Sequence, residues 1–161
     1  MRKRAMRIRR ARPGDGKTIL VLVGDHEPED VPFAARYLRR YFARDPLLAR
    51  DRLFVTEIDG KVIGVSGYYL DHFVSDYAYW LSWFIVAPEY RGEENGSPAG
   101  RMLGAVVGEL RRIRAAKVFV ATASSNGRAV RFYLKHNFEM EGRLADYYSC
   151  GEDQLILGRY L

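Results

Sequence analysis

Two β-rich runs that meet at Asp59-Gly60 constrain the fold of this chain more than any other feature of its sequence. The segment Arg52–Leu70, RLFVTEIDGKVIGVSGYYL, is rich in β-branched and aromatic residues on both sides of that pair. Asp-Gly is a preferred dipeptide of the type I′ turn, which joins two antiparallel strands. The segment therefore predicts a β-hairpin.

The remaining segments predict helices and further strands around this hairpin. In chain order the expected elements are a strand over Met6–Ala11, helices within residues 17–26 and 29–45, the hairpin 52–70, a strand over 79–87 that Pro88 ends, a helix from the loop 89–100 to about Ala115, a strand over 117–123, a helix within 124–138, and a closing hairpin around Gly151. The second helix carries apolar residues on one face: Phe33, Tyr37, Leu38, Tyr41 and Phe42. This order predicts a mixed sheet with helices on both faces.

Composition favours one compact domain spanning residues 1–161. The chain is 48% hydrophobic and contains no tract that resembles a linker. Its apolar runs are too short to cross a membrane, and its basic N-terminus lacks the apolar segment of a secretory signal. We therefore expect a soluble, cytoplasmic protein. Cys150 is the single cysteine, so the chain cannot form an internal disulfide.

The net charge of +6 is concentrated at the N-terminus. Seven Arg or Lys residues precede the first acidic residue, Asp15, whereas the rest of the chain is nearly balanced in charge. Residues 1–5 form a basic leader. An arm of this kind can bind RNA or an anionic surface, but we expect it to be solvated charge rather than a nucleic-acid contact.

Two later segments carry most of the functional information. In WFIVAPEYRG…SPAGRMLG, a strand end, an Arg-Gly pair and a helix start come together, and the N–H groups of a helix start suit a pyrophosphate. The second segment is VFVATASSNGRAVRFYLKHNF, residues 118–138. Combined, the two segments resemble the GCN5-related N-acetyltransferase (GNAT) family. The first matches the family pattern at Val86, Pro88, Arg91, Gly92, Gly100 and Leu103. The second matches at Asn126, Ala129, Phe132, Tyr133 and Phe138, with Asn137 in place of a glycine.

The resemblance implies an α/β acyl-CoA N-acyltransferase fold with a central, mostly antiparallel twisted sheet of about seven strands. It also implies acetyl-CoA as the cofactor. The implied cofactor-binding residues are Phe84, Ile85, Val86, Arg91, Gly92, Gly96, Ser97, Ala99, Gly100, Arg101, Asn126 and Tyr133.

Three of these positions have a specific implied role. The backbone of residues 84–86 would pair with the pantetheine arm, and Asn126 would hydrogen-bond that arm. Tyr133 would place its hydroxyl near the thioester sulfur. A phenol, with an ordinary pKa near 10, can hand a proton to the thiolate that leaves when an amine attacks.

The glycine loop departs from the family pattern. The chain carries about four extra residues, EENG, between Gly92 and Ser97. Pro98, which has no N–H, falls where a glycine is usual, although proline suits the first turn of a helix. Either Gly96 or Gly100 could serve as the loop glycine. The loop is then longer and turned outward, or its affinity for the pyrophosphate is reduced.

The general base is not evident in the sequence. Some members of the family place a Glu five residues before the Asn, but this chain has Ala121 there, and Trp80, Ser82 and Trp83 offer no carboxylate on the preceding strand. The candidates are Glu57, Asp71, His72 and Asp76. His72 has the best-suited ordinary pKa, so His72 and Tyr133 are the predicted catalytic residues.

We therefore expect an acetyl-CoA-dependent N-acetyltransferase that acts by direct transfer in a ternary complex. The alternatives are a non-catalytic acyl-CoA-binding module on the same fold and a nucleic-acid-associated protein. The aromatic and acidic segment YYLDHFVSDYAYW, residues 68–80, could line an acceptor site for a cationic or aromatic amine. The acceptor, a small molecule or a peptide amine, stays open, and so does the oligomeric state, with a homodimer as one alternative. No metal site is expected.

Overall fold

The computed structural model describes residues 5–71, 73, 76–92 and 97–161. Its elements in chain order are β1 (Met6–Arg10), α1 (Gly16–His26), α2 (Val31–Phe42), β2 (Arg52–Ile58), β3 (Lys61–Tyr69), β4 (Ala78–Leu81), β5 (Ile85–Val86), α3 (Pro98–Arg112), β6 (Lys117–Ala123), α4 (Gly127–Lys135), β7 (Glu139–Ser149) and β8 (Glu152–Tyr160). Short 3₁₀ helices over Pro13–Asp15, Pro28–Asp30, Pro46–Leu48 and Pro88–Tyr90 each begin at a proline, whose fixed φ suits a first helical position.

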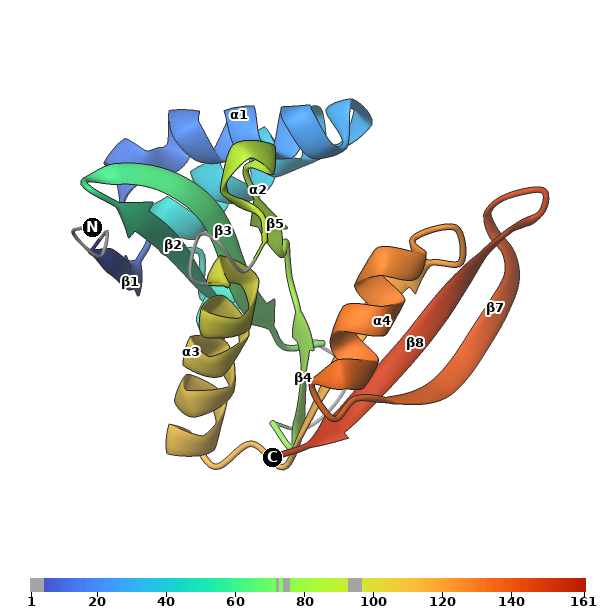
Figure 1. Ribbon diagram of the computed structural model, residues 1–161. Helices are drawn as coiled ribbons and strands as arrows, with labels where there is room; N and C mark the ends of the chain where they lie inside the picture. Colours follow the sequence, from blue (N-terminus) through green and yellow to red (C-terminus); the bar gives the residue numbers. More distant parts are fainter. Residues whose placement is uncertain (1–4, 72, 74–75, 93–96) are drawn as a thin grey trace.

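The strands form one mixed, mostly antiparallel sheet, as predicted (Figure 1). Their order is β1-β2-β3-β4-β6-β8-β7, with β5 paired to β3 beside β4. Only the β4–β6 pair is parallel within the described residues. The predicted hairpin is confirmed as β2–β3. Its turn residues Asp59 and Gly60 have φ values of 50° and 81°, which is the double positive φ of a type I′ turn.

The prediction of one continuous strand over residues 79–87 is wrong. Strand β4 pairs Leu81 with Tyr68, but β5 pairs Ile85 with Val65. Three residues, Ser82–Phe84, therefore lie opposite two residues of β3, which is the count of a β-bulge. The bulge divides the segment in two, so the described residues contain eight strands rather than about seven.

Beyond the bulge the two halves of the sheet separate. Strand β6 pairs with β4 only over Lys117–Phe119 in the described part of the chain, and β5 pairs with β3 instead. Figure 1 shows β8, β7 and α4 diverging from the half that carries β1, β2, β3 and β5. The edges of β5 and of residues 120–123 therefore lie on the two sides of an opening.

Helices cover both faces of the sheet, as predicted. Helices α1 and α2 pack on one face, over a core that contains Leu53, Val55 and Val65. Helices α3 and α4 pack on the other, over a core that contains Phe54 and Tyr68. The predicted apolar face of α2 is only partly buried, because Phe33 is 53% exposed.

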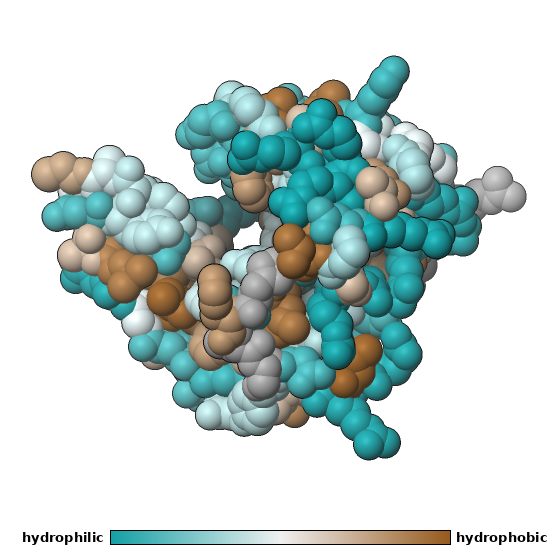
Figure 2. Space-filling model, turned by 180° about the vertical axis from the view of Figure 1, so that it is seen from behind, coloured by the Kyte–Doolittle hydropathy of each residue, from teal (hydrophilic) through white to brown (hydrophobic). Residues whose placement is uncertain are grey.

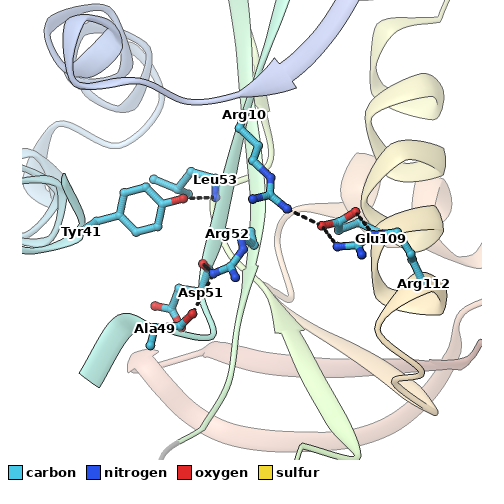
Figure 3. A network of polar contacts seen from close by, with 8 residues as sticks. All are labelled: Arg10, Tyr41, Ala49, Asp51, Arg52, Leu53, Glu109 and Arg112. Carbon is cyan, nitrogen blue, oxygen red and sulfur yellow. Dashed lines mark hydrogen bonds and ion pairs between the residues drawn. The ribbon is translucent and has the colours of Figure 1, made fainter. Parts of the chain in front are cut away.

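Polar contacts fasten the first strand and both helical layers to the sheet (Figure 3). Arg10 of β1 donates to Glu109 of α3 at 2.8 Å, and Glu109 also accepts from Arg112. On the other face, the Tyr41 hydroxyl of α2 accepts from the Leu53 backbone N–H at 3.0 Å.

The basic N-terminal segment is partly neutralised inside the fold. The guanidinium of Arg9 contacts Asp15 at 2.7 Å and Glu57 at 2.6 Å, and Arg10 pairs with Glu109. These arginines hold β1 to its neighbours, which weakens the case for a polyanion-binding arm. Residues 1–4 of the leader lie outside the described residues.

Candidate active site

The opening between the two halves of the sheet exposes backbone groups of β5. The Ala87 N–H donates to the Ile63 carbonyl of β3 at 2.8 Å. Backbone groups of alternate residues point to the same side of a strand, so the N–H and C=O of Ile85 also face β3. The N–H and C=O groups of Phe84 and Val86 then face the opening. Of the three residues predicted to pair with a cofactor, these two direct their backbone groups to the opening, and the pairing itself stays a prediction. Within this protein the Val86 carbonyl accepts from Arg91 Nε at 2.8 Å.

Two cavities adjoin this exposed edge. The first, of about 480 Å³, is here called the basic cavity because its charged and imidazole-bearing lining residues are Arg91, Arg128, Lys135, His26 and His136. Among the described residues, no Asp or Glu lines it. Small residues Gly92, Ala99 and Ala129 line it too, and they leave the backbone approachable.

The second cavity, of about 670 Å³, is here called the acidic cavity. Its acidic lining residues are Glu27, Asp30, Asp51 and Asp71. In the part of the chain that the structure describes, no Lys or Arg lines this cavity. Figure 2 shows the surface hollowed between the lobe that carries α4, β7 and β8 and the rest of the molecule. The two cavities therefore offer opposite charge to whatever binds them.

Tyr133 lies at the boundary, since it lines both cavities. It is only 5% exposed, and its ring contacts Phe84, Phe132 and Phe138 at centroid distances of 6.1, 5.3 and 5.3 Å. Burial raises the pKa of the Tyr133 phenol. The phenol therefore keeps its proton at neutral pH, which a proton donor requires.

The end of α4 fixes the position of Tyr133. Phe138 N–H donates to the Tyr133 carbonyl at 3.1 Å, and Asn137 N–H donates to the Leu134 carbonyl at 3.2 Å. These bonds form a Schellman motif, whose turn residue has positive φ. Asn137 has φ of 63° and fills the place where the family pattern has a glycine. Asparagine tolerates this conformation, so the departure costs little.

Asn126 begins α4 and lines both cavities. Its side-chain oxygen accepts from the Ala129 N–H at 3.1 Å, which is an N-cap bond. The same amide has a nitrogen that can donate to a ligand. Its predicted ligand contact stays a prediction.

The glycine-bearing loop is brought only in part to the basic cavity. Ser97 and Pro98 line it, and Pro98 is the first residue of α3, where proline is favoured. A Cβ on Gly100 would lie 3.5 Å from His136 Nε2, so Gly100 stands close to the cavity rim. Gly96 lies outside the described residues.

Arg101, a predicted cofactor-binding residue, is not among the described residues that line either cavity, and its role stays a prediction. Its guanidinium donates to the Met6 carbonyl at 3.3 Å, and its backbone N–H donates to the Ser97 carbonyl within α3. Both groups are therefore directed at β1 or at the helix itself.

The candidate bases that the structure describes differ in whether they line the acidic cavity. Asp71 lines the acidic cavity, and its carboxylate accepts from the Phe73 N–H at 3.0 Å. Glu57 is held by Arg9, and Asp76 pairs with Arg50 at 3.4 Å on the surface. His72 lies outside the described residues.

Sequence reasoning missed much of both linings. It missed the cationic residues of α4, although Arg128 and Lys135 flank the positions Ala129, Phe132 and Tyr133 at helical spacing, and this periodicity was a usable signal. It also missed the wall of the acidic cavity that the α1–α2 segment supplies. No local pattern marks that wall, because its residues meet β4 only through the fold.

No three His, Cys, Asp or Glu side chains among the described residues gather as metal ligands. Across that same part of the chain, no helix combines the length and apolarity needed to span a membrane.

Residues 22–138 match the family model of the acetyltransferase (GNAT) family. A crystal structure from Desulfovibrio desulfuricans, assigned to GNAT acetyltransferases, superposes with a TM-score of 0.85 at 22% identity, covering 97% of this chain and 99% of that one. Ribosomal-protein-alanine N-acetyltransferase from Brucella melitensis gives 0.77 at 20% identity, with coverage of 96% and 99%.

A third similar structure, yncA from Salmonella typhimurium with its cofactor acetyl-CoA, gives a TM-score of 0.75 at 21% identity, with coverage of 98% and 94%. At these identities the likeness shows the fold. No curated protein matches the sequence.

Proposed function

This chain belongs to the acetyltransferase (GNAT) family, and on that premise we propose that it transfers an acetyl group directly from acetyl-CoA to a primary amine, with Tyr133 as the general acid. The enzyme class and the cofactor follow from the family. The direct transfer and the residue roles are our proposal. The observation that carries it is that the buried phenol of Tyr133 lines both cavities.

The basic cavity fits acetyl-CoA. Arg91, Arg128 and Lys135 provide positive charge for phosphates, and helix α3 begins at the same cavity. The outward-facing backbone groups of Phe84 and Val86 can bond the amides of the pantetheine arm as an added strand would. The Val86 carbonyl accepts a hydrogen bond from the Arg91 guanidinium, so Arg91 would have to share or release this carbonyl when the pantetheine arm binds.

Bound acetyl-CoA supplies the thioester carbonyl that the amine attacks and the sulfur that departs. The Tyr133 hydroxyl donates a hydrogen bond and then its proton to that sulfur. Phe84, Phe132 and Phe138 hold the ring in position and exclude water around it. Asp71, the candidate base that lines the acidic cavity, takes the proton from the amine directly or through water. Cys150 is exposed and lines neither cavity among the described residues, which agrees with transfer without an acetyl-enzyme.

Three measurements test this function. Isothermal titration with acetyl-CoA should show saturable binding, and thiol release should occur only when an amine is present. Initial velocities at varied concentrations of both substrates should give intersecting lines, as a ternary complex requires, rather than the parallel lines of an acetyl-enzyme. Binding without thiol release over a broad amine panel would mean a binding module instead of an enzyme.

A further inference from the structure

We propose that the acceptor is an amine that carries a second positive charge, such as a linear diamine or a longer polyamine. This inference rests on the proposed function, because it places the acceptor in the acidic cavity next to Tyr133. It goes further by naming the chemical class of the acceptor and the residues that select it.

Four carboxylates from different elements line the acidic cavity. Glu27 and Asp30 come from the segment between α1 and α2, Asp51 precedes β2, and Asp71 follows β3. No Lys or Arg is among the described lining residues, so the charged side chains that line this cavity are mainly acidic. A negatively charged acceptor would be repelled, and a neutral one would not use these carboxylates.

Three aromatic rings form a second wall that also suits a cation. Tyr37 lies 5.4 Å from Trp83 edge to face, and Phe33 lies 6.1 Å from Trp83 and 6.4 Å from Tyr37 between centroids. Trp83 belongs to the bulge between β4 and β5, and bulges re-aim side chains in this way. The guanidinium of Arg36 already lies 5.9 Å from the centroid of the Phe33 ring, which leaves Tyr37 and Trp83 as the rings for a ligand. Ring faces attract ammonium groups, so these two rings and the carboxylates favour the same class of ligand.

Asp51 is a buried and hydrogen-bonded member of the acidic lining, not a solvated surface carboxylate. It is 3% exposed, accepts from the Tyr37 hydroxyl at 2.8 Å, and lies 3.4 Å from the Leu70 N–H. Burial and the neighbouring Asp51 carboxylate raise the pKa of Tyr37, so this hydroxyl remains a donor. A carboxylate held in this way is weakly screened by water and salt, and it ties an aromatic ring to the acidic wall.

The chemistry of transfer explains why one charge alone is insufficient for recognition. The attacking amine must lose its proton, so it is neutral when it reacts. A carboxylate can retain an ammonium group only if the acceptor has another one. We therefore place the reacting end beside Tyr133, within reach of Asp71 directly or through water, and the charged end among the other carboxylates that line the acidic cavity.

Three amines of equal chain length test the inference. We expect kcat/KM for 1,5-diaminopentane to exceed that for pentylamine by about tenfold or more, with 5-aminopentanoate the poorest. Equal values for all three would overturn the inference while leaving the acetyltransferase function intact.

A binding measurement separates this inference from the proposed function. The two tryptophans of the chain, Trp80 and Trp83, both line the acidic cavity, so intrinsic fluorescence reports on it directly. We expect 1,5-diaminopentane to change the fluorescence saturably, at lower concentration than pentylamine, with the difference shrinking in high salt. If diamine binding is seen without acetyl transfer, the proposed function fails but the charge selection stands; no preference in binding overturns the selection.

Neighbouring acidic residues provide a matched control. The double variant Glu27→Gln/Asp30→Asn should lower the ratio of diamine to pentylamine kcat/KM roughly three- to tenfold. Asp25→Asn/Glu29→Gln removes the same charge at the end of α1 and in the segment that follows it, but these two residues do not line the cavity, so the ratio should be unchanged. Equal effects of the two double variants would mean that only the overall surface charge matters.

Discussion

The basic and acidic cavities share a boundary but differ completely in charge. Arg91, Arg128 and Lys135 line one, whereas Asp30 and Asp51 lie on the side of the other. One opening in a sheet can thus present two linings of opposite charge side by side. Under the proposed function, each cavity would attract the ligand of opposite charge, and the two ligands would meet where the shared lining is mostly uncharged. The shared residues among those described are His26, Phe84, Ile85, Asn126, Ala129 and Tyr133.

The largest effect is expected where the two cavities meet. Tyr133→Phe should lower kcat about 100-fold, since proton donation typically contributes at least that much. The dissociation constant for acetyl-CoA, measured by calorimetry, should change less than about twofold, because the ring and its packing remain. Tyr77→Phe removes a phenol outside both cavities and serves as the control. Equal losses of kcat and binding would mean that Tyr133 only shapes the pocket.

The second prediction concerns the basic cavity alone. The double variant Arg128→Gln/Lys135→Gln should weaken acetyl-CoA binding roughly tenfold at low salt, because two cations near the phosphates are removed. Raising the salt concentration should shrink the difference from the unaltered protein. The control is the double variant Arg128→Lys/Arg131→Gln. It keeps a positive charge at position 128 and removes the charge of Arg131, which lies on the same helix but does not line the cavity, so its affinity for acetyl-CoA should be nearly normal. If both variants bind acetyl-CoA equally weakly, the overall charge of α4 matters rather than the cations that line the basic cavity.

The pH profile tests the state of the boundary residue. Burial raises the pKa of Tyr133, so its proton-donating form persists as the pH rises. The acceptor amine loses its proton over the same range, so kcat/KM should climb up to about pH 10 without a descending limb. A fall in rate near pH 10, matched by its absence in Tyr133→Phe, would indicate a phenol with an ordinary pKa.

A smaller effect is expected at the end of α4. Asn137→Ala should lower the free energy of unfolding by about 1 kcal/mol, because alanine is strained at the positive φ of this position. Asn137→Gly, the matched variant, should be neutral or slightly stabilising. Urea unfolding measures both. If alanine and glycine behave alike, the Schellman turn does not restrain the helix that carries Tyr133.

The smallest effect is expected at Glu109 of α3, which lines neither cavity and pairs with Arg10 and Arg112. Hydrogen bonds from Arg112 and Arg10 lower the pKa of Glu109 to about 2. A lowered pKa stabilises the fold above the ordinary value near 4.5, and that contribution is lost as the pH falls toward 2. Glu109→Gln should therefore cost about 1 kcal/mol or less at pH 7, and its effect should vanish near pH 2. Thermal melts at both pH values measure this, and kinetic constants should be unchanged at pH 7.

The sequence predicted most of the elements because their signals are local. The Asp59-Gly60 turn and the start of α4 at Asn126 each depend on residues that are neighbours in the chain. The break between β4 and β5 was not predicted. Residues 79–87 read as one apolar strand, and only the register against β3 reveals that Ser82–Phe84 form a bulge.

The site divides in the same way. The residues of the basic cavity lie largely in two contiguous motifs, so Arg91, Gly92, Ser97 and Asn126 were named from the sequence and are brought to one cavity. The lining of the acidic cavity comes from segments as far apart in the sequence as Glu27 and Thr122. No pattern within either segment predicts that the two meet in the fold.

The family, the order of helices and strands, and the candidate phenol were predictable from the sequence, because each depends on the identity and spacing of nearby residues. Where the sheet opens, and which charges line each side of the opening, became known from the folded chain. Strand register and helix placement depend on packing between distant segments, which no local pattern of residues specifies. A carboxylate such as Asp51 acquires its role only when Tyr37 is folded against it.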